Sequence, residues 1–110
     1  MKTMLFKFLD GNKIIPLVKE EHDIDQGDID KIQSLIQCRC FTHASVKIMG
    51  EYFDVFCDDD GLIEQKPVLS FGDKFSFAGN ILFVGRADDE GNTLDLTEKQ
   101  IEILKSLPIL

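Results

Sequence analysis

The chain has 110 residues, about the length of one domain, and its 20 acidic and 12 basic residues give a net charge of −8. This charge argues against direct binding of nucleic acid, because a protein that neutralises phosphates needs clustered Lys and Arg. The apolar fraction of 44% and nine Phe are enough for a packed core. We therefore expect a single domain over residues 1–110 that folds without metal or disulfides.

Two apolar runs open the sequence, Met4–Leu9 and Lys13–Lys19, and Asp10-Gly11-Asn12 lies between them. Asp-Gly between two such runs predicts a β-hairpin. Polar and acidic residues then dominate Lys19–Gly27, which predicts a solvated loop.

The segment from Asp28 to about Gln37 has the pattern of a helix. Asp28 can cap its N-terminus, and apolar residues recur at helical spacing. They make one stripe, which predicts a helix that faces the core: Ile29, Ile32, Leu35 and Ile36.

A second hairpin is expected where Ala44–Ile48 and Tyr52–Cys57 flank Met49-Gly50-Glu51. Because side chains alternate along a strand, Phe53, Val55 and Cys57 share one face of the second run. The other face then carries Tyr52, Asp54 and Phe56.

The C-terminal third begins with Val68–Ala78, where alternating Phe residues suggest a short strand. Asn80–Ala87 is almost entirely apolar, which predicts a central strand covered on both faces. Thr97 followed by Gln100 is a capping box, so a helix should begin there and run to about Leu107.

Together these elements predict an α+β fold, with a mixed, mostly antiparallel sheet of five to seven strands and two helices. If both helices covered one face, the other would be free or would pair with a second copy. A homodimer is therefore one expectation, through a sheet edge near Met4–Leu9 or an uncovered face at Phe71–Phe77.

Several of these segments occur in the order of a known family: the helix at Asp28–Gln37, the strand and acidic turn at Tyr52–Leu62, and Ile81–Gly85 behind Gly79-Asn80. An acidic turn and Leu96–Ile101 follow. Over roughly residues 28 to 105 the chain resembles domain-of-unknown-function family 3846, which is met in phages, plasmids and integrated elements of bacteria. The resemblance implies a mobile-element setting and supplies no catalytic residue.

Cys38, Cys40 and His43 are the best candidates for metal ligands. Zinc-binding cysteines are usually separated by two to four residues, whereas only one separates Cys38 from Cys40. A fourth ligand would have to be Cys57 or His22. Cys40 or Cys38 could also act as a nucleophile activated by a histidine, but no acid stands at a supporting position. We therefore expect no metal, no cofactor and no enzymatic activity.

Acidic residues cluster at two turns that each end in glycine, and we expect them to form an interaction surface. Neither turn has the spacing of an EF-hand loop. The residues of this expected surface are Asp58, Asp59, Asp60, Asp88, Asp89 and Glu90.

The first functional hypothesis is a small accessory or regulatory protein of phage or mobile-element origin, which acts by binding an unidentified protein. Because Lys7 and Asp10 interrupt the first apolar run and no membrane span follows, we expect it in the cytoplasm, with free thiols and without membrane contact. One alternative is an acidic DNA mimic that inhibits a host defence protein. A second is a small enzyme or nucleotide-binding module.

Overall fold

The structure, a computed structural model, describes residues 1–8, 17–25, 27–38, 40–59, 68–71, 75–90 and 92–107. This part of the chain forms seven strands and two helices. In chain order they are β1 (Lys2–Phe8), β2 (Leu17–Asp23), α1 (Ile29–Ile36), β3 (Phe41–Ile48), β4 (Glu51–Asp58), β5 (Val68–Phe71), β6 (Phe75–Ala78), β7 (Ile81–Gly85) and α2 (Glu98–Ser106).

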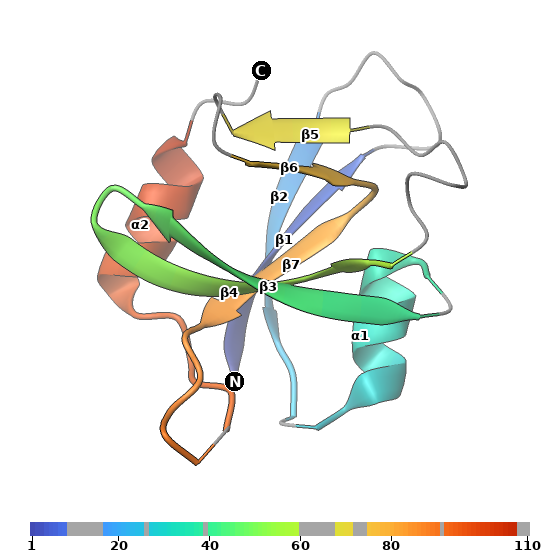
Figure 1. The fold of residues 1–110 in the computed structure, drawn as a ribbon, viewed down its shortest axis with the longest axis horizontal. Coiled ribbons are helices and arrows are strands. Elements are labelled where there is room, and N and C mark those ends of the chain that lie inside the picture. Colours follow the sequence, from blue (N-terminus) through green and yellow to red (C-terminus); the bar gives the residue numbers. More distant parts are fainter. Residues whose placement is uncertain are drawn as a thin grey trace.

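Five of the strands form one twisted sheet in the order β2-β1-β7-β4-β3, and each neighbouring pair is antiparallel (Figure 1). The expected α+β class and the number of strands are therefore confirmed. A separate antiparallel pair, β5 and β6, accounts for the short strand expected in Val68–Ala78.

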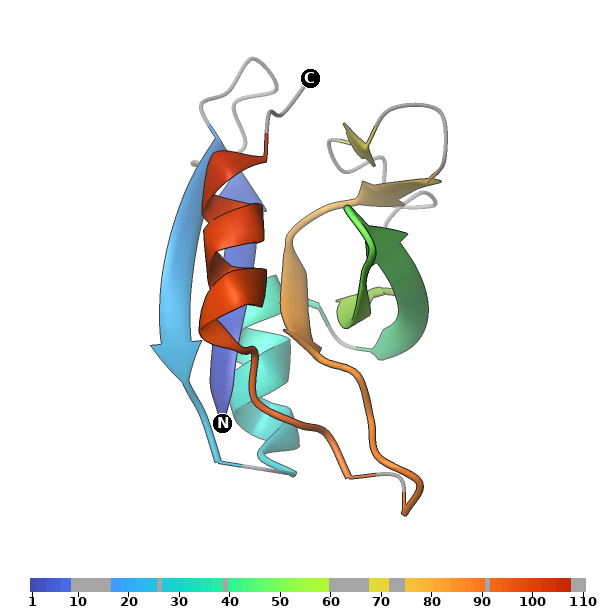
Figure 2. The same ribbon diagram turned by 90° about the vertical axis from the view of Figure 1, so that its left-hand side faces the viewer.

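β7 lies at the centre of the sheet, and all five of its residues are buried, as its apolar sequence predicts. Alternate residues face two different cores. Ile81 and Phe83 pack in the core that α2 covers, whereas Leu82 and Val84 pack in the core that α1 covers. The two helices therefore cover opposite faces of the sheet, because each face of a fully buried central strand needs its own apolar cover (Figure 2).

Both helices begin where the sequence predicts. The Asp28 side chain caps α1 by accepting a hydrogen bond from the amide of Lys31 at 3.1 Å. Thr97 and Gln100 form the complete capping box of α2, with reciprocal bonds of 2.9 and 3.1 Å. Neither helix of the described chain is long and apolar enough to cross a membrane.

The apolar stripe of α1 faces the core as expected. Ile32 and Ile36 are buried, and Leu35 is partly buried against the same cluster. Ile29 departs from the expectation, since it lies in the first turn with 56% of its surface exposed. The stripe therefore becomes core only where the helix lies over the sheet.

β3 and β4 form the expected hairpin, with Met49 and Gly50 as its two-residue turn. Both residues have positive φ, 50° and 82° respectively. Positive φ at both central positions defines the type I′ turn, whose twist matches that of the strands. The turn places Ile48 opposite Glu51 and thereby fixes the register of all the other residue pairs between β3 and β4.

The first two strands correct two expectations. β1 is not a sheet edge, because it lies between β2 and β7. The segment after Lys19 is not a loop, because β2 continues to Asp23 and pairs with β1 along its whole length. An outer strand tolerates its acidic residues since they can reach cations, as Glu20 reaches Lys7 at 3.0 Å.

Two further predictions concern residues outside the described part of the chain. They are the turn at Asp10-Gly11-Asn12 and the acidic turn at Asp60-Gly61. An uncovered face was expected at Phe71–Phe77. In this segment the structure describes the side chain of Phe77, which packs against the core that α2 covers.

We predict that Gly85→Ala destabilises the fold by about 1–3 kcal/mol, the usual cost of overpacking. A Cβ at this position would lie 2.5 Å from the carbonyl oxygen of Asp95 and 2.8 Å from that of Leu94. These are backbone atoms held by the bond from the Gly85 amide to the Leu94 carbonyl oxygen, 2.9 Å long. Urea unfolding followed by circular dichroism measures the loss.

Ser34→Ala, on the exposed side of α1, is the control and should stay within about 0.5 kcal/mol of the parent chain. Equal stability of Gly85→Ala and this control would contradict the close approach at β7.

Candidate functional site

The three candidate metal ligands lie in different surroundings. Cys38 follows α1 and packs against the core on that face, Cys40 is exposed, and His43 lies on β3 with its ring 6.5 Å from that of Phe56. Cys57, considered as a fourth ligand, belongs to the core on the opposite face. Among the residues that the structure describes, no three His, Cys, Asp or Glu side chains are grouped so that they could hold a metal ion.

The two acidic turns lie at opposite ends of the sheet. β4 and β7 are antiparallel, with Cys57 opposite Ile81 and Phe53 opposite Gly85. The described acids that follow β4 therefore lie at the other end of the sheet from those that follow β7. Asp58 is moreover buried, with 9% of its surface exposed, whereas Asp59 is exposed and Asp60 lies outside the described residues.

The acidic turn after β7 uses one of its acids internally. A carboxylate oxygen of Asp88 accepts hydrogen bonds from the amides of Glu90 and Asn92, both 2.9 Å long. Such bonds are typical of Asp in turns, where the side chain satisfies backbone donors. Asp89 and Glu90 remain exposed at the tip.

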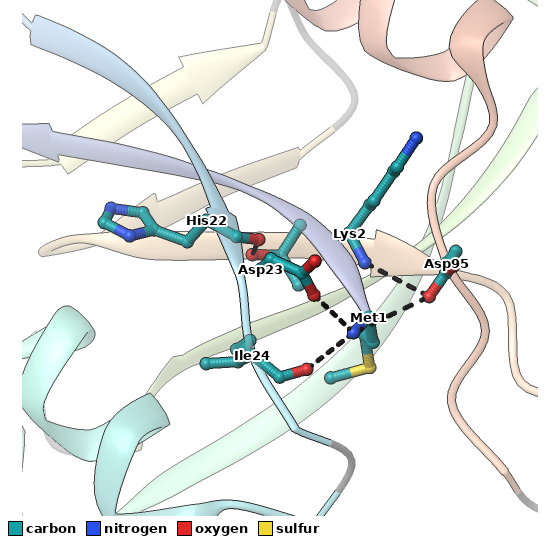
Figure 3. Close-up of polar contacts among 7 residues, drawn as sticks. Met1, Lys2, His22, Asp23, Ile24 and Asp95 are labelled. Atoms are coloured by element: carbon teal, nitrogen blue, oxygen red, sulfur yellow. Dashed lines mark hydrogen bonds and ion pairs between the residues drawn. The ribbon is translucent and has the colours of Figure 1, made fainter.

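An amino group holds three segments together near this end of the sheet (Figure 3). The Met1 ammonium donates to the carboxylate of Asp23 at 2.8 Å and to the carbonyl oxygen of Ile24 at 2.7 Å. The Asp95 carboxylate lies 3.9 Å from the Met1 ammonium and also accepts a hydrogen bond from the amide of Lys2. The hydrogen bond from the ammonium lowers the pKa of Asp23 and raises that of the Met1 amine. These contacts tie β1, β2 and the segment before α2.

Three side chains form an exposed row across three adjacent strands. Tyr52 of β4 lies opposite Lys47 of β3, and Arg86 directly follows β7. The Lys47 Nζ atom lies 5.2 Å from the centroid of the Tyr52 ring, and the Arg86 guanidinium carbon lies 4.9 Å from it. Tyr52 keeps 46% of its surface exposed. We call these three residues the Tyr52 row.

The Tyr52 row lies on the face that α1 covers, but away from the helix. This follows from the alternation along β4, because Tyr52 points to the same side as Phe56, which packs in the α1 core. On β3 the residues of this face, His43, Ser45 and Lys47, are all exposed. This part of the sheet is therefore open to solvent among the described residues.

A buried carboxylate fixes the backbone beneath the row. Asp54 is 7% exposed, and its two oxygens accept one hydrogen bond each, from the Ser45 hydroxyl at 2.8 Å and from the Ala87 amide at 3.0 Å. The bonds connect β4 to β3 on one side and to the residue after Arg86 on the other. The strands that carry both cations are thus held to the strand that carries the ring.

Lys47 and Arg86 differ from other basic residues of the described chain in their contacts with carboxylates. Lys7, Lys99 and Lys105 lie 3.0, 3.9 and 3.7 Å from carboxylate oxygens. Within the described chain, by contrast, Lys47 and Arg86 contact the Tyr52 ring and no carboxylate. Two adjacent cations outside any ion pair of the described residues therefore flank the exposed ring, and the acidic tip at Asp89 and Glu90 follows shortly after Arg86.

Sequence reasoning did not find this row. The two-residue turn places Lys47 opposite Tyr52. The contact between these two residues could therefore have been derived from the predicted hairpin. Arg86 joins them only through the pairing of β4 with β7, which no local pattern reveals.

The environment of Cys57 disfavours its thiolate form. Burial, together with the negative charges of Asp59 and Asp58, raises the pKa of Cys57 above its usual value of 9.0. Because the thiolate is the reactive form, this shift lowers the reactivity of the group. Cys40, in contrast, is exposed to solvent.

Comparison with known families gives one match. The model of the family described as "Domain of unknown function (DUF3846)" matches residues 13–107, most of the chain. Neither the curated proteins nor the solved structures contain a match to this sequence.

We predict that iodoacetamide at pH 8 modifies Cys40 first and Cys57 at least about tenfold more slowly. The raised pKa has a second consequence, since around pH 9.0 the unfolded thiol ionises more readily than the folded thiol. The free energy of unfolding should therefore fall as the pH rises past this value. Peptide mapping by mass spectrometry and urea unfolding between pH 7 and 10 measure the two effects.

In urea the modification rates of Cys40 and Cys57 should become similar, which serves as the control. Equal rates in the folded protein would show that Cys57 is accessible and would contradict its burial.

Proposed function

The chain belongs to this family of unknown function, and we propose that it is a non-enzymatic accessory domain that binds another protein through the Tyr52 row. The observation that carries the proposal is the half-exposed ring of Tyr52 between two cations that have no carboxylate partner among the residues the structure describes. Tyr and Arg are the residue types most enriched at the centres of protein interfaces.

The row is also ordered before any partner arrives. Each cation–π contact is worth about 0.5–1 kcal/mol at an exposed site, and the hydrogen bonds of Asp54 fix the strands below. Binding then costs less side-chain entropy than it would for free Lys and Arg side chains. This supports a role in recognition.

The polar groups of the described chain also favour binding over catalysis. Asp54 accepts bonds that hold strands together, and Asp88 accepts bonds that close a turn. A general acid or base needs a carboxylate or imidazole directed at a substrate. The setting we propose is the bacterial cytoplasm during the life of a phage or another mobile element, as the family resemblance implies.

We predict that Tyr52→Ala and the double variant Lys47→Glu, Arg86→Glu lose the protein partner. The first removes the ring and the second reverses the charge on both sides of it, so each should reduce partner recovery about tenfold or more. The measurement is affinity capture from a bacterial host lysate, with quantitative mass spectrometry of the proteins retained.

Lys31→Glu is the matched control, because it reverses an exposed charge on α1 and should retain the partner. Thermal melting of all variants verifies that each is folded. If the parent chain and the Tyr52→Ala variant retain the same proteins in the same amounts, the Tyr52 row is not the binding surface.

A further inference from the structure

The outer edge of the sheet at β3 carries unpaired backbone groups. β3 is the last strand in the sheet order, and β4 is its neighbour on the inner side. The type I′ turn at Met49-Gly50 makes Ile48 and Glu51 a hydrogen-bonded pair. Since such pairs alternate along an antiparallel ladder, every second residue of β3 directs its amide and carbonyl groups toward β4.

The remaining residues of β3 direct these groups outward. Counting back from Ile48, they are Lys47, Ser45, His43 and Phe41. Within the described residues, no backbone amide or carbonyl of these four is bonded to another strand. Within the described residues, the edge of β3 therefore offers the amide and carbonyl groups of four residues to an additional strand.

The same residues carry the exposed side chains beside the Tyr52 row. His43, Ser45 and Lys47 are exposed on the α1 face, and Lys47 itself belongs to the row. β3 contains no Asp or Glu, although the chain has 20 acidic residues, whereas β2 at the opposite edge contains three. Outward backbone groups thus coincide with a strand that has one lysine and no carboxylate.

We propose that β3 accepts an extended acidic segment of the partner protein as an additional strand of the sheet. The backbone of this segment bonds to the outward groups of β3, and its alternate Asp or Glu side chains lie on the α1 face beside Lys47. The inference rests on the proposed function and specifies the chemistry of the partner. Backbone bonds at a sheet edge supply affinity in this mode of recognition, while alternate side chains supply specificity.

Two observations favour an acidic partner over a second copy of this chain. Antiparallel pairing of two β3 strands about Ser45 would place Lys47 of one beside His43 of the other, and both chains carry a net charge of −8. Lysines on edge strands often prevent pairing by pointing into solvent. Lys47 instead lies over the Tyr52 ring, where it leaves the backbone edge accessible.

The test uses synthetic eight-residue peptides and the ¹⁵N-labelled full chain. We expect a peptide of alternating valine and glutamate to shift the amide signals of His43, Ser45 and Lys47 and to slow their exchange with water. A peptide of alternating valine and lysine should bind at least about tenfold more weakly at low salt, and raising the salt should reduce the difference. The acidic peptide methylated on alternate backbone nitrogens should not bind.

Ser45→Pro provides a test within the protein. Proline removes the outward amide of Ser45 and leaves the ladder with β4 intact, so it is tolerated at a sheet edge. Ser45→Ala is the matched comparison, because both variants lose the hydrogen bond to Asp54 but alanine retains the amide, so the difference between them measures the amide alone. We expect Ser45→Pro to bind the acidic peptide at least about tenfold more weakly than Ser45→Ala does.

Equal binding of the acidic and basic peptides, binding that persists after backbone methylation, or amide shifts confined to other strands would each overturn the proposal. So would the absence of any shift at millimolar acidic peptide. The methylated peptide keeps the test decisive if Ser45→Pro does not fold. Loss of a captured partner in Tyr52→Ala without peptide binding at β3 would leave the proposed function standing and reject only the strand addition.

Discussion

The burial of β7 is the constraint on which the rest of the structure depends. Five consecutive residues without solvent contact need a strand on each side and an apolar layer on each face. β1 and β4 supply the neighbouring strands, and α2 and α1 supply the layers. Fixing β7 in this way also fixes the residue that follows it, so that Arg86 emerges beside Tyr52 at the end of the ladder.

The same constraint separates the charges of the protein. Because β4 and β7 run in opposite directions, the described acids that follow these two strands lie at opposite ends of the sheet. β3, at one edge of the sheet, carries Lys47 and His43 and no carboxylate.

Local patterns in the sequence were enough for each element but not for their assembly. The caps of α1 and α2, the turn at Met49-Gly50 and the apolar run of β7 depend on residues a few positions apart, and each was predictable. Strand order depends on contacts distant in sequence, which periodicity does not encode. The acid-rich β2 was mistaken for a loop for a related reason, since its acids are accommodated by Lys7 and by Lys105 of α2. Arg86 was missed because its partner Tyr52 lies 34 positions earlier.

The two edges of the sheet are treated differently, and the difference bears on function. β2 is engaged by α2, because Lys19 donates to the carbonyl oxygens of Lys105 and Leu107 at 3.0 and 2.8 Å, and Glu21 lies 3.7 Å from the Lys105 ammonium. Lys19 and Glu21 lie opposite Phe6 and Met4, so these contacts are on the face of the sheet that α2 covers. Among the described residues, β3 has no ion pair, and its lysine lies over the Tyr52 ring. An exposed edge is a liability in a folded protein unless it has a use. The edge strand without acids or ion pairs in the described chain is therefore the one at which we propose that the sheet extends.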